Sequence, residues 1–166
     1  MPLKILSADI TTLKVDAIVN AANTELQAGG GVCGAVFRAA GYRELQTACD
    51  KLAPIQTGEA VITPGFNLPA KFIIHTAGPI WHGGHFGEEN LLRACYVNSL
   101  KRAFEHDLRS IAFPLISSGI YGYPKSDAFR VAVSTIKDFL SHQDLDVTLT
   151  VLDTRKLIFE SDITND

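Results

Sequence analysis

The sequence predicts an α/β fold with a largely parallel central sheet. Short apolar segments with the composition of strands alternate with longer amphipathic segments that are typical of helices. Glycine and proline concentrate in the loops between these segments. The chain has 166 residues, near the ~150 of an average domain, and 46% of them are hydrophobic, enough for a proper core. We therefore expect a single domain over residues 1–166, with its core at about 3–153 and a frayed polar tail at 161–166.

The N-terminal half is predicted to contain strands that flank a pair of helices. The strands are short, and most are rich in β-branched or aromatic residues. We expect them at residues 4–7, 17–20, 60–63 and 72–76. Residues 34–40 and 42–52 have the apolar spacing of helices and lie between the second and third strands.

The C-terminal half is predicted to contain two longer helices and two further strands. Apolar residues recur at helical spacing over residues 88–107 and again over 126–141, where Ser126 is the expected N-terminal cap. The strands are expected at 111–114 and 147–152, and residues 155–160 are typical of the start of a terminal helix.

Charge and composition exclude several classes of protein. The 15 basic and 18 acidic side chains give a net charge of -3, which disfavours general nucleic-acid binding by counterion release. Apolar runs such as residues 94–97 are far shorter than the ~18 residues of a membrane helix. The N-terminus lacks the pattern of a signal peptide, so we expect a cytoplasmic protein. Cys33, Cys49 and Cys95 form no C-x-x-C pair and are expected to be free thiols.

A glycine-rich segment at residues 28–34 predicts a phosphate-binding loop. Three consecutive glycines, Gly29 to Gly31, allow the backbone N–H groups to approach a ligand, and a helix start adds a positive dipole end. A flexible loop is the simpler alternative. Residues 29–34 also match the G-x-G-x-x-G pattern of dinucleotide-binding folds, but eight residues separate Gly29 from Asn20, and the acidic Asp50 lies in a helical pattern.

A second segment at residues 113–124 has similar features. Ser117-Ser118-Gly119 and Gly122 offer another backbone cradle, and the Tyr121 ring has the shape to cover a sugar or base. Two cradles in one domain suggest a diphosphate. Taken alone, Tyr121 is as well explained by packing. Asp9, after the first strand, caps the next turn in the ordinary case and accepts from an exocyclic amine of a base in the alternative.

Histidines elsewhere have simpler explanations. His82 and His85 resemble half of a metal site, but no Cys or carboxylate pair completes it at zinc-like spacing, and a solvated loop is the favoured interpretation. His75, at a strand end among apolar residues, is expected to be a satisfied structural histidine. Trp81 is expected to pack in the neighbouring loop.

Taken together, these segments resemble the macrodomains. The similarity runs in order from Asp9 to about Asp153. It is carried by residues 9–11, 16–23, 29–32, 57–58, 68–70, 74–79 and 117–124. The resemblance implies a three-layer α/β/α fold with a mixed, six-stranded central sheet. It also implies an ADP-ribose site across the carboxyl ends of the central strands.

The resemblance also implies roles for individual residues. Asp9 would accept from the adenine amino group, beside the Ile10 backbone. Asn23 would contact the distal ribose and, with Gly30 and Gly31, is expected to carry catalysis by positioning substrate or water. The other expected ligand-binding residues are Asn20, Val32, Cys33, Ser117, Ser118, Gly119, Ile120, Tyr121 and Leu152. Backbone N–H groups of the two glycine segments would enclose the diphosphate, which suits a chain of net charge -3.

Two positions depart from the family pattern. Cys33 stands where the well-known hydrolases of this type carry an aspartate, and a thiol does not replace a carboxylate unless its pKa falls far below ~8.5. Leu152 stands before Asp153, where many macrodomains carry an aromatic residue that stacks on adenine. Weaker adenine affinity is expected, because an aliphatic side chain lacks ring stacking.

Two functions follow from the resemblance. The first is an enzyme that removes mono-ADP-ribose from acidic side chains, deacetylates O-acetyl-ADP-ribose, or does both. The alternative is a module that reads ADP-ribose without turnover, because of Cys33. The expected partners are ADP-ribose, related metabolites and mono-ADP-ribosylated proteins. Membrane binding is not expected. We expect a monomer that needs neither metal nor cofactor.

Overall fold

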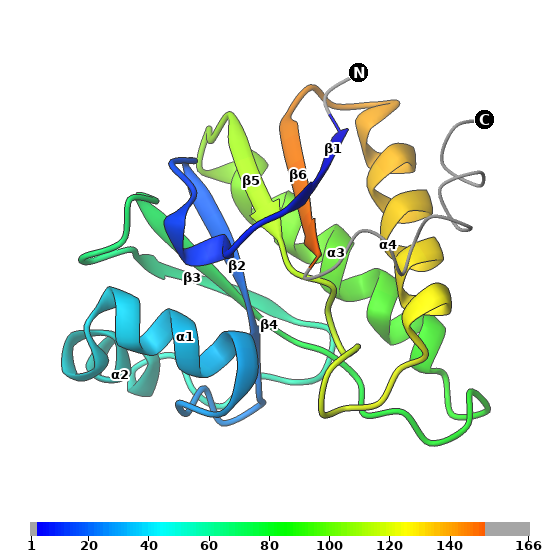
Figure 1. Cartoon of the computed structure of the whole chain (residues 1–166), viewed down its shortest axis with the longest axis horizontal. Helices are drawn as coiled ribbons and strands as arrows, with labels where there is room; N and C mark the ends of the chain where they lie inside the picture. Colours follow the sequence, from blue (N-terminus) through cyan, green and yellow to red (C-terminus); the bar gives the residue numbers. More distant parts are fainter. Residues whose placement is uncertain (1–2, 152–166) are drawn as a thin grey trace.

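The computed structural model describes residues 3–151, which form one six-stranded sheet with helices on both faces (Figure 1). The strands are β1 (Leu3–Ser7), β2 (Ala17–Ala22), β3 (Ala60–Pro64), β4 (Phe72–Ala77), β5 (Ser110–Phe113) and β6 (Asp146–Val151). The helices are α1 (Gly31–Ala40), α2 (Tyr42–Asp50), α3 (Glu88–Glu105) and α4 (Lys125–Leu140), with a short 3-10 helix η1 (Ile10–Thr12) after β1. Each predicted strand is present, and its first and last residues agree with the prediction within two residues.

The sheet is mixed, as predicted. Its strand order is β1-β6-β5-β2-β4-β3, and every neighbouring pair is parallel except β3 with β4. The carboxyl ends of parallel strands share one edge of a sheet, so the loops after β2, β4 and β5 gather at one edge, seen at the bottom of Figure 1. Ligands of open α/β sheets bind at such an edge.

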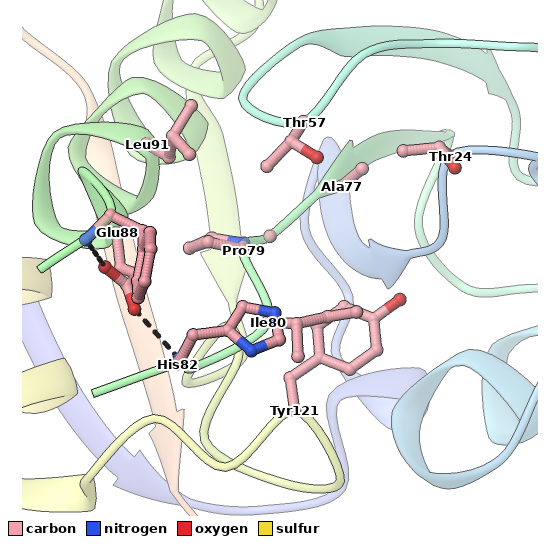
Figure 2. A pocket seen from close by; sticks show the side chains of 11 residues that line it. Thr24, Thr57, Ala77, Pro79, Ile80, His82, Glu88, Leu91 and Tyr121 are labelled. Atoms are coloured by element: carbon pink, nitrogen blue, oxygen red, sulfur yellow. Dashed lines mark hydrogen bonds between the residues drawn. The ribbon is translucent and has the colours of Figure 1, made fainter. Parts of the chain in front are cut away.

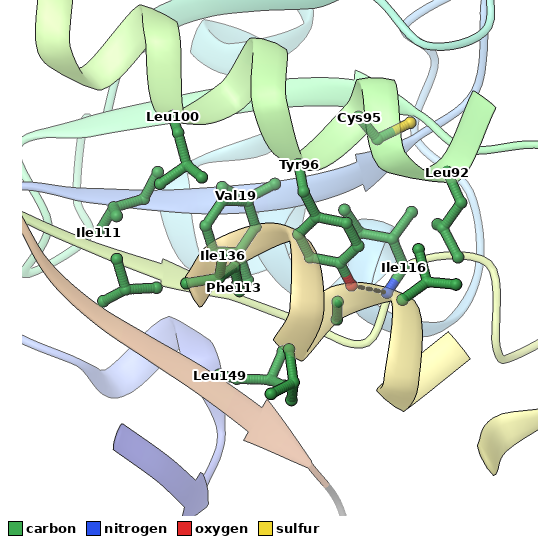
Figure 3. Packing of buried hydrophobic residues seen from close by; sticks show 14 of the residues in the cluster. Val19, Leu92, Cys95, Tyr96, Leu100, Ile111, Phe113, Ile116, Ile136 and Leu149 are labelled. Atoms are coloured by element: carbon green, nitrogen blue, oxygen red, sulfur yellow. Dashed lines mark hydrogen bonds between the residues drawn. The ribbon is translucent and has the colours of Figure 1, made fainter. Parts of the chain in front are cut away.

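Two hydrophobic cores hold the three layers together. One lies between the sheet and helices α3 and α4, and the other lies between the sheet, α1 and α2. In the first core, Tyr96 packs against Phe113, and its hydroxyl accepts from the Ile116 N–H (3.1 Å) and donates to the Pro114 carbonyl (3.3 Å) (Figure 3). The start of the β5–α4 loop is therefore anchored in the core.

Several predicted helix ends are wrong. Helix α1 begins at Gly31, three residues before the predicted start at 34, because glycines of low helix propensity form its first turn. The predicted Ser126 cap is also wrong: α4 begins at Lys125, and Pro124 precedes it without a side-chain cap. Helix α3 ends two residues early, where Asp107 has a φ of 56°. Leu152, Asp153 and residues 155–166 lie outside the described residues.

Two expectations about the chain are supported. Within residues 3–151, no helix is both long and apolar enough to cross a membrane. Cys33, Cys49 and Cys95 are all buried free thiols, as predicted.

Candidate functional site

The loop between β2 and α1 is held by side chains. The Asn23 amide closes a ring on Gln27, since Oδ1 accepts from the Gln27 N–H (3.0 Å) and Nδ2 donates to the Gln27 carbonyl (2.9 Å). From α2, Gln46 donates to the Leu26 carbonyl (3.0 Å) and accepts from the Ala28 N–H (3.2 Å). These contacts fix the position of Asn23 relative to the glycines that follow.

The glycine run forms the first turn of α1 and exposes its backbone donors. Gly30 is the N-cap residue and supplies no side-chain cap. The N–H groups of Gly30, Gly31 and Val32 find no acceptor within residues 3–151. A helix start with free N–H groups carries a partial positive charge and binds anions.

The β5–α4 loop offers a second row of donors. It is closed by backbone hydrogen bonds from Gly122 N–H to the Gly119 carbonyl (3.0 Å) and from Tyr123 N–H to the Ser117 carbonyl (2.9 Å). Within the described part of the chain, the N–H groups of Gly119, Ile120 and Tyr121 have no acceptor. The buried Ser117 hydroxyl also lacks a partner there. No helix start explains this second row, and its N–H groups are open to water or to a bound anion.

The two rows lie next to each other. A Cβ placed on Gly30 would lie 3.6 Å from Ile120 Cδ1, an ordinary van der Waals contact across the gap between the loops. Ile120 itself is 88% exposed, so its side chain is available to cover a ligand. The geometry therefore supplies two sets of backbone donors for one polyanionic group.

A cavity of about 360 Å³ adjoins this double loop at Tyr121 (Figure 2). The loops after β2, β4 and β5, the segment before β3 and the start of α3 all contribute to it. Its lining consists of Thr24, Thr57, Ala77, Gly78, Pro79, Ile80, His82, Phe86, Glu88, Leu91 and Tyr121. Sequence reasoning missed this cavity because no local pattern unites residues from so many segments.

Comparison with known proteins identifies the family. A family model of the Macro domain matches residues 19–132. The chain belongs to the macrodomain family. This finding confirms the resemblance and the fold, and sets the dinucleotide-binding alternative aside.

Individual relatives agree with this assignment. A macro domain-containing protein of Chlorobaculum tepidum is 58% identical over 83% of this chain and 80% of its own length. The O-acetyl-ADP-ribose deacetylase of Salmonella typhimurium is 51% identical over 86% of this chain and 82% of its own. A structure of a variant Oceanobacillus iheyensis macrodomain with ADPR has a TM-score of 0.92 at 41% identity, covering 98% and 92% of the two chains.

In this macrodomain, Cys33 points into the interior. Its thiol donates to the Gln27 carbonyl (3.6 Å) and accepts from Asn20 Nδ2 (3.7 Å). Burial raises the pKa of Cys33 and outweighs the hydrogen bonds that lower it. The thiol therefore stays protonated near neutral pH and has no carboxylate-like charge, which agrees with a packing role.

A buried polar network continues from Cys33 across the sheet. Asn20 Nδ2, which only donates, lies 3.1 Å from His75 Nδ1, so the opposite ring nitrogen carries the proton toward Thr63 Oγ1 at 2.9 Å. Burial lowers the pKa of His75 to about 3 and keeps the ring neutral. His75 is thus a satisfied structural histidine, as predicted. Asn20 lies beneath the glycine loop as part of this network.

Asp9 caps η1, as its ordinary interpretation predicts. Its Oδ1 accepts from the Thr11 N–H (3.0 Å) and from Thr11 Oγ1 (2.7 Å). Among the described residues, no donor bonds the other carboxylate oxygen, Oδ2, so the cap is compatible with a role toward adenine. Ile10 is buried beside it. The predicted ligand roles of Asp9, Ile10 and Asn20 remain predictions, as do those of the glycine loops and Leu152.

The loop that follows β4 is organised by Glu88. This carboxylate accepts from the N–H groups of His82 (2.8 Å), Gly84 (3.1 Å) and Phe86 (2.7 Å). Burial alone would raise the pKa of Glu88, but these donors outweigh it and lower the pKa to about 2. Within residues 3–151, no three His, Cys, Asp or Glu side chains gather as a metal site, so His82 and His85 complete none. The loop is a built wall of the cavity.

Proposed function

We propose that this macrodomain binds ADP-ribose and hydrolyses ADP-ribose esters. The substrates are O-acetyl-ADP-ribose and proteins that carry mono-ADP-ribose on acidic side chains. The observation that carries the proposal is the pair of adjacent loops with unpaired backbone N–H groups, because the two phosphates of ADP-ribose require donors on both sides. Relatives named O-acetyl-ADP-ribose deacetylase support the enzymatic part.

The chain places its donors for a diphosphate without Lys or Arg. The N–H groups of Gly30, Gly31 and Val32 would bind one side of the diphosphate, and those of Gly119, Ile120 and Tyr121 would bind the other. The predicted Ser118 N–H already donates to the Leu115 carbonyl (3.4 Å). The partnerless Ser117 hydroxyl is buried beneath this row, against Gly78. Tyr121 would pack on the distal ribose, and Asp9 would bind the adenine amino group.

Asn23 is the residue proposed to position the reacting groups. Each end of its amide already bonds Gln27, which fixes its orientation. An amide has two N–H groups and two oxygen lone pairs, so one of each remains for a ribose hydroxyl and a water. In the hydrolysis, water adds a hydroxyl to the carbon under attack and a proton to the released oxygen, giving ADP-ribose and a carboxylic acid. The ligand's own phosphate would help Asn23 to place this water.

A second candidate function is a reader that binds without turnover. The protonated, inward-facing thiol of Cys33 favours it, because this position lacks the carboxylate of the well-known hydrolases. Both candidates share the ADP-ribose site, so binding alone does not separate them.

The cellular setting is also part of the proposal. We propose that the protein acts in the cytoplasm as a monomer with one domain, as the sequence predicts. Its protein partners would be those modified on glutamate or aspartate. Water is the one co-reactant that the proposed hydrolysis needs.

A time course of ADP-ribose release tests the proposal. The substrates are O-acetyl-ADP-ribose and a protein mono-ADP-ribosylated on glutamate, with binding of ADP-ribose measured by calorimetry in parallel. We expect release by the wild type and a loss of about 100-fold in Asn23→Ala, since misplacement by about 1 Å costs this much. ADP-ribose affinity should fall less than tenfold in this variant.

The matched control is Asn90→Ala, which removes the same group from an exposed position on α3. It should retain wild-type release and affinity. Tight binding without release by the wild type would establish the reader. Equal release by the wild type and Asn23→Ala would remove Asn23 from the mechanism.

A further inference from the structure

The cavity beside Tyr121 is separate from the diphosphate loops but shares a wall with them. Thr24 lies next to Asn23, and Tyr121 belongs to the second row of donors, and both line the cavity. A group attached to the distal ribose therefore has a direct route into it. We propose that this cavity is an acyl subsite, which takes aliphatic acyl chains longer than acetyl from ADP-ribose esters. This inference rests on the proposed function.

The walls have the chemistry of an aliphatic site. Apolar side chains of Pro79, Ile80, Phe86 and Leu91 form much of the lining. The volume of about 360 Å³ falls within the range of small-molecule pockets and greatly exceeds the needs of an acetyl group. Phe86 is 71% exposed and Ile80 is 51% exposed, so a longer chain would cover apolar surface that now faces water.

Three hydroxyl groups, those of Thr24, Thr57 and Tyr121, line the cavity. Figure 2 shows the Tyr121 hydroxyl directed toward the side where Thr24 and Thr57 lie. No described residue forms a hydrogen bond with any of these three hydroxyl groups. Such groups suit an ester carbonyl, which accepts hydrogen bonds at the polar head of an otherwise aliphatic chain.

The cavity wall is preformed. Glu88 holds three backbone N–H groups of the segment from His82 to Phe86. The Trp81 N–H donates to the Tyr121 carbonyl (2.8 Å), and the Trp81 ring packs against Tyr123 with 4.6 Å between centroids. A preorganised pocket loses little entropy on binding, so added chain contacts translate into affinity.

The reaction is a hydrolysis that is balanced by water alone. Water oxygen bonds the acyl carbon, the bond between that carbon and the ribose oxygen breaks, and the ribose oxygen takes the proton. The carboxylic acid is released from the cavity and ADP-ribose from the loops. No atom changes its oxidation state overall.

The test compares kcat/KM for O-acetyl-, O-butanoyl- and O-hexanoyl-ADP-ribose. Burying a methylene group should raise kcat/KM by about three- to fourfold. In Leu91→Trp, which fills the cavity from α3, the ratio of hexanoyl to acetyl values should fall to near one. Asn90→Trp adds the same ring at an exposed position on that helix and should keep the wild-type ratio.

A second variant and a binding measurement keep the outcomes distinct. Phe86→Ala removes an exposed part of the wall, so its ratio should fall severalfold even if Leu91→Trp does not fold. Turnover of the acetyl ester without chain-length dependence overturns the subsite but not the proposed hydrolase. If no ester is cleaved, the proposed hydrolase is wrong. The subsite is then tested by binding: longer esters must displace bound ADP-ribose more strongly than the acetyl ester does. Leu91→Trp should lower kcat/KM for the hexanoyl ester more than it lowers ADP-ribose release from a protein modified on glutamate. The reverse order would mean that the cavity does not bind an aliphatic chain.

Discussion

The two loops that flank the glycine site differ in how they are held. The β2–α1 loop depends on side chains: Asn23 and Gln46 bond its backbone, and Cys33 joins it to the polar network that ends at His75. The β5–α4 loop depends on its own backbone turns, on the Tyr96 hydroxyl at its base and on close packing against Gly78. Both present unpaired N–H groups, so the same ligand chemistry is supported by two different structural solutions.

This difference has consequences for the site. The first loop is coupled to buried titratable groups, so its geometry responds to charge in the interior. The second loop is coupled to packing, and responds to volume at its base. A substitution that adds volume should therefore affect mainly the β5–α4 loop, and a charge in the interior should affect mainly the β2–α1 loop.

The largest combined effect, on stability and ligand affinity together, is expected from added volume beneath the β5–α4 loop. In Gly78→Ala, the new methyl group would overlap Ser117 Oγ and lie 2.6 Å from Ile116 Cγ2. We expect a loss of stability of about 1–3 kcal/mol from overpacking. ADP-ribose affinity should fall by about tenfold to 100-fold, since one or more hydrogen bonds to a charged group, each worth about 1.5–3 kcal/mol, would be displaced. Calorimetry and thermal unfolding measure both effects.

Gly30→Ala provides the matched variant on the other loop. Gly30 has a φ of -89°, and its new Cβ would lie 3.6 Å from Ile120 Cδ1, so the fold accommodates it. Its stability should stay close to that of the wild type, within about 1 kcal/mol. Equal losses of stability in Gly30→Ala and Gly78→Ala would contradict the packing difference between the loops.

The next effect is expected from charge beneath the β2–α1 loop. The pKa of His75 is lowered by burial to about 3, below its ordinary value of 6.5. Its contribution to stability is therefore complete above pH 6.5 and is lost as the pH falls from 6.5 toward 3. The loss should reach about 2–3 kcal/mol by pH 4.5. The pKa of Glu88, lowered to about 2, adds a separate loss only below pH 4.5.

Hydrogen exchange and chemical denaturation between pH 7 and 4.5 test this coupling. The hydrogen-bonded amides of Leu26, Gln27 and Ala28 should lose protection before those of Gly122 and Tyr123. The control is His75→Asn, which places a neutral amide near Asn20 and has no proton to gain in this pH range. The free energy of unfolding of His75→Asn should depend less on pH than that of the wild type. The same pH dependence in both proteins, or equal loss of protection in both loops, would show that His75 does not control the first loop.

Local patterns in the sequence predicted the sheet and both glycine loops. Strands were identified by short β-branched runs, and the loops by glycines beside a helix start. The helix boundaries were less predictable. Gly31 has poor helix propensity yet begins α1, and α4 begins after Pro124 without the side-chain cap that was expected from Ser126.

The parts that could not be predicted depend on contacts between distant segments. Nothing near Thr24 or Thr57 in the sequence marks them as neighbours of Tyr121, and the cavity exists only after the fold is formed. No local pattern marks Glu88 either, although it accepts hydrogen bonds from three N–H groups of the preceding loop. The inward orientation of Cys33 likewise depends on Asn20, 13 residues earlier.

The smallest effect is expected at Cys33 itself. If the missing carboxylate limits turnover, Cys33→Asp should raise the rate of ester hydrolysis by about tenfold, below the usual gain of about 100-fold or more from a general base. Asn20 Nδ2 lies 3.7 Å from the present sulfur and is placed to donate to the new carboxylate. Single-turnover kinetics on O-acetyl-ADP-ribose measure the chemical step.

The matched control is Cys33→Asn, which has the shape of aspartate without its charge and should show no increase. The Gln27 carbonyl lies 3.6 Å from the present sulfur and would repel a carboxylate, so the two neighbours of Cys33 oppose each other. A lower rate in Cys33→Asp would mean that this repulsion dominates and that the loop has adapted to a neutral thiol. In that case Asn23 and the ligand's phosphate must place the water alone, and the side-chain-held loop acts through its rigidity rather than through a charge of its own.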